Sequence, residues 1–443
     1  MEKLIIEGGL PLEGTVHTAG AKNATLPILA AALLTHEPLS IPNAPRLRDV
    51  NTMVSLLRLL GCEIESAPDG ALVIQAAGDI SPVAEWEQVR QMRGSVCVLG
   101  PLLARNGRAR VSLPGGCAFG VRPIDLHLKG MEALGAEVRV EHGYVHATAP
   151  EGGLQGAEMF LASGSGPTVL GTANVMMAAT LARGRTVIHG AACEPEVSDL
   201  ADCLNAMGAS ISGQGSPRLE IEGVDELHGA THRVIPDRIE AGTYLVAGAL
   251  TGGRVRVADC RPDHLFALLD HMARARIPLE IGPDWVETNP RTGTRDSGAS
   301  RYSGVPRATD VTTHAYPGFP TDLQAQWMTL MCLADGISLI EEQIYPDRYM
   351  HVAELARLGA RLRRVGTRTI VQGLGATGTA SGGALSGAPV TASDLRASAA
   401  LVLAGLVATG TTEVHRVYHI DRGYEPIEDR LNALGANIRR VPE

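Results

Sequence analysis

Apolar residues recur at helical spacing in several segments of the chain, and each of these segments ends in a short turn of small residues. Residues 49–61, DVNTMVSLLRLLG, and residues 197–208, VSDLADCLNAMG, place their apolar side chains on one helix face. Asp49 and Ser198 stand where a side chain can cap a helix N-terminus. The pattern predicts amphipathic helices that bury one face in a core.

This combination of helix and turn is repeated six times. In each copy a glycine turn and a β-type run precede the helix, and another β-type run follows it. The copies are spaced by roughly 75 residues, which is longer than a solenoid repeat and sufficient for a small α/β unit. The turns that end the six helices are centred on Gly61, Gly135, Gly208, Arg276, Gly359 and Gly435.

The fourth copy differs from the others at its turn. Glycine at a helix end favours a left-handed cap because it has no Cβ atom, and other residues seldom adopt that conformation. Arg276 takes the place of this glycine. We therefore expect the fourth copy to use a different turn and to pack differently.

Composition narrows the class of protein. A chain of 443 residues is long enough for two domains. Its net charge of −9 argues against nucleic-acid binding through overall charge, so an anionic ligand must meet local positive charge. Seven cysteines without a CxxC pair fit neither a disulfide framework nor a zinc site. We expect no metal and no cofactor, and the absence of a long apolar run favours a soluble, cytoplasmic protein.

Cys117 has a different sequence context from most of the other cysteines. It lies in the loop PGGCAFG, whose glycines let the thiol move and be reached by solvent. Arg122 and the helix that follows would lower its pKa, so Cys117 is a candidate proton donor or nucleophile. The alternative is a small buried hydrophobic residue. That alternative is predicted for Cys62, Cys97, Cys203, Cys260 and Cys332.

Several cations stand at helix starts or beside glycine turns, where the helix dipole does not favour them. Lys22 precedes an apolar helix, and Arg396 falls in the first turn of another. A surface salt bridge explains each one alone, but their recurrence favours a site for an anion. Asp322 and Asp394 also stand at helix starts, where capping is one interpretation. The further cations of this kind are Arg93, Arg348 and Arg422.

These segments resemble one known family, the UDP-N-acetylglucosamine 1-carboxyvinyltransferases, which are enolpyruvyl transferases. The segments that carry the resemblance include GAKNATLPILAAALL, MRGSVCVLGPLLAR, SLPGGC, RPIDLHLKG, PDRIEAGTYLVA, FPTDLQAQW, DLRASAALVLAG and YHIDRGYEPIEDRL. They occur in family order from residue 20 to residue 430. The resemblance implies an α/β fold of two inside-out α/β barrels built from six βαβαββ-type repeats. It implies one domain at 22–236, a second domain made of 1–21 and 237–443, and an active site in the cleft between them.

The resemblance also implies a reaction. The enolpyruvyl group of phosphoenolpyruvate would pass to the 3'-hydroxyl of UDP-N-acetylglucosamine by addition and elimination, with release of phosphate. Asp322 would take the hydroxyl proton, and Cys117 would protonate the methylene carbon and react with fosfomycin. This is the first committed step of peptidoglycan synthesis, which implies roles in cell-wall biogenesis, cell shape, the cell cycle and cell division. It implies no cofactor, nucleic acid, membrane or obligate protein partner.

Other positions that match the family complete the expected site. Forked guanidiniums suit a small, highly charged substrate such as phosphoenolpyruvate. The further catalytic residues implied are Lys22, Asn23, Arg396 and Arg422. The substrate-binding residues implied are Arg93, Arg122, Pro123, Ile124, Asp125, Leu126, Thr168, Val169, Asp237, Ile344, Arg348 and Asp394.

Three positions depart from the family pattern. Gly166 stands where many members carry a lysine near the nucleotide phosphates, and Leu170 replaces a common glycine. We therefore expect the diphosphate to be bound differently in detail. Cys193 stands where some members have arginine, which makes a second reactive thiol a hypothesis.

Two alternatives remain open. A 5-enolpyruvylshikimate-3-phosphate synthase shares the fold and chemistry, but it carries a GSKS-type signature where this chain has GAKNAT, and this chain has the PGGC loop. A non-catalytic paralogue that binds a UDP-sugar would be expected to lose Cys117, Asp322 or an arginine, and none is lost. Both comparisons favour the transferase that acts on the sugar nucleotide.

Overall fold

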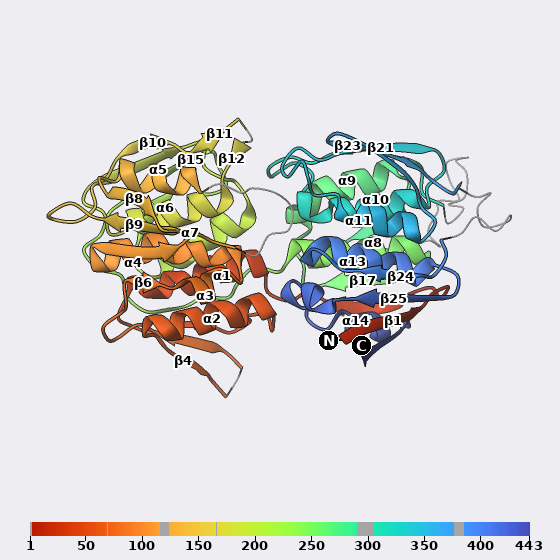
Figure 1. Cartoon of the computed structure of the whole chain (residues 1–443), viewed down its shortest axis with the longest axis horizontal. Helices are drawn as coiled ribbons and strands as arrows, with labels where there is room; N and C mark the ends of the chain where they lie inside the picture. Colours follow the sequence, from red (N-terminus) through yellow and green to blue (C-terminus); the bar gives the residue numbers. More distant parts are fainter. Residues whose placement is uncertain (1, 69, 116–123, 165, 290–304, 376–384) are drawn as a thin grey trace. The chain divides into compact units, whose positions relative to one another are not determined.

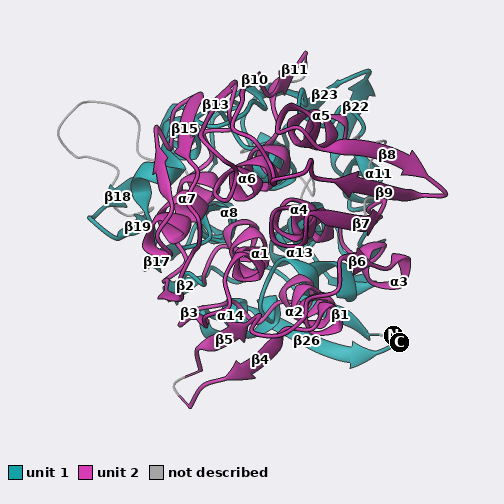
Figure 2. Ribbon diagram, turned by 90° about the vertical axis from the view of Figure 1, so that its left-hand side faces the viewer, with its two compact units in different colours: residues 1–19, 118–120, 236–443 teal, residues 20–117, 121–235 magenta. Residues whose placement is uncertain are grey.

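The computed structural model describes residues 2–68, 70–115, 124–164, 166–289, 305–375 and 385–443. These residues form two compact units (Figure 2). Of the described residues, unit 1 contains the ranges within 2–19 and 236–443, and unit 2 contains those within 20–115 and 124–235. Each unit has its own hydrophobic core.

Unit 2 alternates short helices with short strands along the chain (Figure 1). Its helices are α1 (Lys22–Ala31), η1 (Ala32–Leu34), α2 (Arg48–Leu60), α3 (Trp86–Val89), η2 (Arg93–Val98), α4 (Leu99–Asn106), α5 (Asp125–Ala133), α6 (Val169–Ala179) and α7 (Pro195–Ala206), where η marks a 3-10 helix. Its strands are β3 (Leu39–Ile41), β4 (Glu63–Ser66), β5 (Leu72–Gln75), β6 (Val83–Ala84), β7 (Arg108–Ser112), β8 (Glu137–Glu141), β9 (Tyr144–Thr148), β10 (Glu158–Phe160), β11 (Ala162–Ser163), β12 (Gly166–Pro167), β13 (Arg185–His189), β14 (Ser210–Ser212), β15 (Arg218–Glu222) and β16 (Ala230–Thr231).

Unit 1 contains both ends of the chain. Its helices are α8 (Arg238–Thr251), η3 (Pro262–Leu265), α9 (Phe266–Arg274), η4 (Thr321–Leu323), α10 (Gln324–Cys332), α11 (Met350–Arg357), α13 (Leu395–Val407), η5 (Val417–Arg422) and α14 (Ile427–Ala433). Its strands are β1 (Glu2–Glu7), β2 (Glu13–His17), β17 (Arg254–Ala258), β18 (Leu279–Ile281), β19 (Trp285–Thr288), β20 (Val311–Thr312), β21 (Ile337–Glu341), β22 (Arg361–Val365), β23 (Arg368–Gln372), β24 (Pro389–Thr391), β25 (Thr411–His415) and β26 (Asn437–Pro442).

The four-stranded sheets of the two units share one arrangement of strands. Within the described residues unit 2 has the orders β16-β3-β5-β4, β6-β7-β9-β8 and β10-β13-β15-β14, and unit 1 has β18-β19-β17-β2, β20-β21-β23-β22 and β24-β25-β1-β26. Each sheet has one parallel pair and two antiparallel pairs. In the last sheet β1 lies between β25 and β26, so both ends of the chain meet there (Figure 1).

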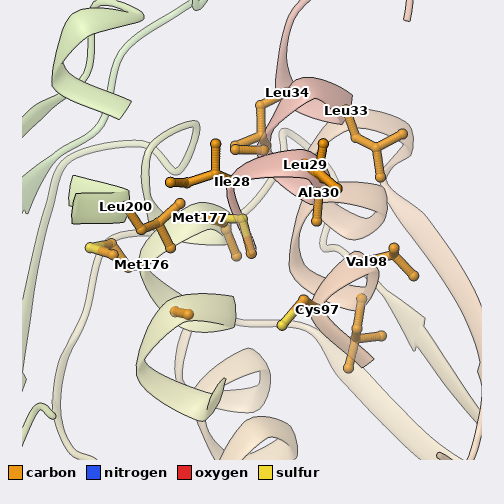
Figure 3. Packing of buried hydrophobic residues seen from close by; sticks show 14 of the residues in the cluster. Ile28, Leu29, Ala30, Leu33, Leu34, Cys97, Val98, Met176, Met177 and Leu200 are labelled. Carbon is orange, nitrogen blue, oxygen red and sulfur yellow. The ribbon is translucent and has the colours of Figure 1, made fainter. Parts of the chain in front are cut away.

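Each core contains helices that are buried on nearly every side, together with residues of the sheets and of amphipathic helices. In unit 1 the helices α8, α10 and α13 are buried along nearly their whole length and pack against one another. In unit 2, α1 and α6 are similarly buried, and Figure 3 shows their side chains with those of η2 and α7. A helix that is apolar all round is stable only where neighbours cover every face. None of the described helices combines the length and apolar composition that a membrane span requires.

The turn of the fourth copy corrects one prediction. Arg276 adopts a left-handed φ of 61°, as Gly61 does with a φ of 110°. Its N–H donates to Ala273 O at 2.9 Å, and the next N–H, of Ile277, donates to Met272 O at 3.0 Å. Corresponding bonds, three and five residues apart, close the turn at Gly61. The expectation of a different turn was wrong, because these hydrogen bonds hold a non-glycine residue in the left-handed region.

Two predicted helix caps are also wrong. The helix α2 begins at Arg48, so Asp49 lies in its first turn and does not cap it. The helix α7 begins at Pro195, which places Ser198 inside it. A proline is favoured at the first helical position because the missing N–H has no intrahelical partner there. The two helices exist where they were predicted, but their starts were misplaced.

Candidate functional site

In unit 1, residues from separate segments form a buried network of charges. Arg348 is 5% exposed and lies between two carboxylates. Its Nη1 donates to Asp322 Oδ1 at 2.6 Å, and its Nε donates to Asp394 Oδ2 at 2.9 Å. Burial opposes the charged guanidinium, but Asp394 and Asp322 outweigh it and raise the pKa of Arg348 well above its ordinary value. The network therefore fixes a permanent cation beside Asp322.

Asp394 is also the cap of α13. Its Oδ1 accepts the backbone N–H groups of Arg396 at 2.8 Å and of Ala397 at 3.2 Å. Burial raises the pKa of Asp394, but Arg348 and these N–H donors outweigh burial and lower it. The capping interpretation is confirmed for Asp394, and the same carboxylate also holds Arg348.

Arg396 lies in the first turn of α13 and is 1% exposed. Its Nη2 donates to Asp237 Oδ2 at 2.8 Å, and its Nη1 donates to Gly423 O at 2.8 Å. Asp237 in turn caps α8 by accepting the N–H groups of Ile239 and Glu240. A cation in the first turn of a helix is disfavoured unless an anion lies nearby. For Arg396, Asp237 is one such anion. Arg422 ends η5, directly before Gly423.

A further buried carboxylate, which the sequence did not single out, lies beside this network. Glu342 follows β21 and is completely buried. Its Oε1 accepts the N–H groups of Ile344 and Tyr345, both at 2.9 Å. Its Oε2 accepts the hydroxyl of Thr321 at 2.9 Å. Glu342 therefore joins the segment of Ile344 to the segment of Asp322.

In unit 2, Lys22 and Asn23 are the first two residues of α1. The Nζ atom of Lys22 lies 2.9 Å from Asp49 Oδ2, and both side chains are buried. Asp49 thus acts as an ionic partner, where the sequence had predicted a cap. Arg93 begins η2, which packs against α1.

The expected nucleotide contacts lie at two helix starts in unit 2. Ile124, Asp125 and Leu126 lie at the start of α5. Thr168 caps α6, because its Oγ1 accepts the N–H of Gly171 at 3.2 Å, and Val169 is the first residue of that helix. The helices α5 and α6 pack against each other. Helix N-termini offer free N–H groups and a positive dipole to an anion.

The positions that depart from the family pattern lie in the same unit. Gly166 has a φ of 97° in β12, a conformation that a lysine would seldom adopt. Leu170 is half-buried in the first turn of α6. Cys193 is also half-buried, and burial followed by the charge of Glu194 raises its pKa. Both effects disfavour its thiolate, so the structure argues against the hypothesis of a second reactive thiol.

The other cysteines can be assigned where they are described. Burial was predicted correctly for five of them, and it raises the pKa of Cys97 and Cys332 to about 12. Cys117, Arg122 and Pro123 lie outside the described residues. The structure thus joins five of the predicted residues of unit 1 by direct ion pairs: Asp322 and Asp394 with Arg348, and Asp237 with Arg396. Predicted residues of unit 2 lie on elements that pack against one another, α1 against η2 and α5 against α6.

Comparison with known proteins identifies the class. The family model of EPSP synthase (3-phosphoshikimate 1-carboxyvinyltransferase) matches residues 6–431. The crystal structure of the enolpyruvyl transferase NikO from Streptomyces tendae is 25% identical, covers 99% of this chain and 98% of its own, and has a TM-score of 0.85. EPSP synthase from Acinetobacter baumannii is 16% identical with a TM-score of 0.72, and both chains are fully covered. The chain therefore has the predicted α/β fold of the enolpyruvyl transferases.

Curated relatives narrow the class further. The UDP-N-acetylglucosamine 1-carboxyvinyltransferase of Anaeromyxobacter sp. (strain Fw109-5) is 53% identical over 442 residues, which is 99% of both chains. That of Oleidesulfovibrio alaskensis is 50% identical over 443 residues, which is the full length of both. The chain belongs to the family of the UDP-N-acetylglucosamine 1-carboxyvinyltransferases, as its sequence motifs predicted.

Proposed function

We propose that the protein transfers the enolpyruvyl group of phosphoenolpyruvate to the 3'-hydroxyl of UDP-N-acetylglucosamine and releases phosphate. Relatives at 50 to 53% identity over the whole chain are named for this carboxyvinyl transfer. The observation that carries the proposal is the position of Asp322. Its Oδ1 accepts from Arg348 Nη1 at 2.6 Å, and its side chain is still 24% exposed. A carboxylate that a fixed cation holds in one orientation, and that is still open to solvent, can be reached by a substrate hydroxyl, as a general base must be.

Asp322 is proposed to accept the proton of the 3'-hydroxyl. The oxygen then attacks C2 of phosphoenolpyruvate, while Cys117 delivers a proton to the methylene carbon. The resulting tetrahedral adduct loses a proton from that carbon and expels phosphate, which restores the double bond. Arg348 holds the Asp322 carboxylate in place, and the other cations stabilise charge on the phosphate and carboxylate.

The cations proposed to bind phosphoenolpyruvate are Lys22, Arg93, Arg122, Arg396 and Arg422. Asp49 holds Lys22 and Asp237 holds Arg396, so both charges are set in place before substrate binds. Charges that need no rearrangement stabilise a reaction more strongly than mobile ones. We place Asn23 at the reacting centre, together with these cations.

The sugar nucleotide is proposed to bind at residues 123–126 and at Thr168 and Val169, with Ile344 near the sugar. The helix starts of α5 and α6 support this assignment, because their N–H groups suit the diphosphate. Asp394 serves by holding Arg348. No metal or other cofactor enters the proposed reaction.

The same proposal covers the architecture and the cellular role. Residues 22–236 form one domain, and residues 1–21 with 237–443 form the other, each an inside-out α/β barrel of three repeats. The shared strand pattern of the four-stranded sheets supports six repeats. The reaction would be the first committed step of peptidoglycan synthesis in the cytoplasm. It would link the protein to cell shape and division and make it a target of fosfomycin.

The test is phosphate release from phosphoenolpyruvate by the purified protein, with UDP-N-acetylglucosamine, with shikimate 3-phosphate, or with no acceptor. Release that depends on the sugar nucleotide is expected. Release that depends only on shikimate 3-phosphate would move the protein to the sister activity. No release with either acceptor would favour a non-catalytic protein that binds a UDP-sugar.

A further inference from the structure

Glu342 forms an unusually complete set of hydrogen bonds for a buried carboxylate. Its Oε1 accepts from the Thr313 hydroxyl at 2.8 Å and from the N–H groups of Ile344 and Tyr345 at 2.9 Å. Its Oε2 accepts from the Thr321 hydroxyl at 2.9 Å. Removing a carboxylate from water costs several kcal/mol, and such donors offset that cost. The two oxygens therefore have separate tasks: Oε1 holds the turn after β21, and Oε2 holds Thr321.

Thr321 connects Glu342 to the proposed base. It directly precedes Asp322 in η4. Because its hydroxyl hydrogen is donated to Glu342, its oxygen can accept from Arg348 Nη1, which lies 3.2 Å away. The same Nη1 donates to Asp322 Oδ1 at 2.6 Å. A continuous chain of hydrogen bonds thus runs from Glu342 through Thr321 and Arg348 to Asp322.

We infer that Glu342 is a positioning residue for Asp322: through Thr321 it orients Arg348, and Arg348 orients the carboxylate that accepts the proton. The inference rests on the proposed function. Glu342 is fully buried, whereas the Asp322 side chain is 24% exposed, so Glu342 acts without touching substrate. The Glu342 side chain also accepts the backbone N–H of Ile344, which is proposed to lie near the acceptor sugar. The same carboxylate therefore contacts both the Thr321 segment and the Ile344 segment.

The substitution Glu342→Gln tests the two oxygens separately. The amide oxygen can replace Oε1 and keep the turn at Ile344, while the amide nitrogen replaces Oε2 and donates to Thr321. The Thr321 hydroxyl must then turn its own hydrogen away from position 342. We expect kcat to fall about tenfold or more, with the KM values of both substrates within about twofold of wild type. A general loosening of the fold would change KM and the melting temperature as well.

Two further variants show whether Glu342 acts through Thr321. Thr321→Val removes the hydroxyl that links Glu342 to Arg348. Thr313→Val removes the other hydroxyl that donates to Glu342, and within the described residues that hydroxyl bonds neither Arg348 nor Asp322. We expect Thr321→Val to lower kcat as Glu342→Gln does. The double variant, which carries both substitutions, should show no larger fall in kcat than either single variant. Thr313→Val is the matched control and should keep kcat within about twofold of wild type.

Each outcome decides the inference. A kcat of Glu342→Gln within about twofold of wild type, or additive losses in the double variant, would overturn it. If Glu342→Gln does not fold, equal kcat in Thr321→Val and Thr313→Val overturns it, and a loss confined to Thr321→Val supports it. A wild-type protein without turnover on the two substrates would overturn the proposed function and this inference together.

Discussion

Glu240→Gln should make the protein more stable, and the gain should grow with pH. Glu240 lies fully buried in α8. Burial first, and then the charge of Asp237, raises its pKa from 4.5 to about 7, although the N–H of Ala19, which donates to its Oε2 at 2.8 Å, partly offsets the rise. The folded protein therefore resists ionising this carboxyl group.

The sign of the effect follows from proton binding. Between pH 4.5 and pH 7 the folded protein keeps a proton that the unfolded chain has lost, so stability falls as pH rises through this window. At about 1.4 kcal/mol per pH unit, the full effect is about 3 kcal/mol, and between pH 5 and pH 8 it is about 2.5 kcal/mol. Glutamine carries no charge, and its oxygen can still accept the Ala19 N–H, so the variant escapes this loss.

The assay is urea unfolding at pH 5 and pH 8, followed by tryptophan fluorescence, to which Trp327, buried in the same unit, contributes. The free energy of unfolding of Glu240→Gln minus that of wild type should be about 2.5 kcal/mol larger at pH 8 than at pH 5, so the variant gains stability relative to wild type as the pH rises. Asp429→Asn, an exposed carboxylate of α14, is the control and should show no such change. A difference for Glu240→Gln that is the same at both pH values would refute the reasoning.

Three further predictions concern the network and the thiol. Asp322→Ala should remove turnover while leaving UDP-N-acetylglucosamine binding measurable by calorimetry, and undiminished turnover would exclude Asp322 as the base. Cys117→Ala should largely abolish irreversible inactivation by fosfomycin, and full inactivation of the variant would show that assignment to be wrong. Asp394→Ala leaves Arg348 without one of its buried carboxylates and removes a helix cap, so it should lower the free energy of unfolding by about 3 kcal/mol or more in urea denaturation. A loss below about 1 kcal/mol would mean that Asp322 alone satisfies the buried guanidinium.

Local patterns predicted the helices and the turns that end them, because these depend on nearest neighbours along the chain. The starts of the helices were less accurate, since Asp49 turns toward Lys22 on another helix. Competition of this kind between a local cap and a distant ion partner cannot be seen in sequence spacing. At Arg276 the error was different. The preference of the left-handed region for glycine predicted a different turn, but the local backbone hydrogen bonds form the same turn with arginine.

The site could be predicted mainly where residues match a family motif. The carboxylates that hold the cations come from distant segments: Asp237 lies 159 positions from Arg396, and Asp394 lies 46 positions from Arg348. Glu342 carries no signal of its own, because it stands in an ordinary run after a strand. Only the folded structure shows that its carboxylate meets Thr321.

The most direct test of the central claim is the structure of the product. After incubation with phosphoenolpyruvate and UDP-N-acetylglucosamine, the nucleotide product would be isolated and its linkage determined by mass spectrometry and carbon NMR. The proposed function predicts an enolpyruvyl ether on the 3'-oxygen of the sugar, formed by wild type and absent with Asp322→Ala. An unmodified nucleotide, or an enolpyruvyl group on another hydroxyl, would contradict it.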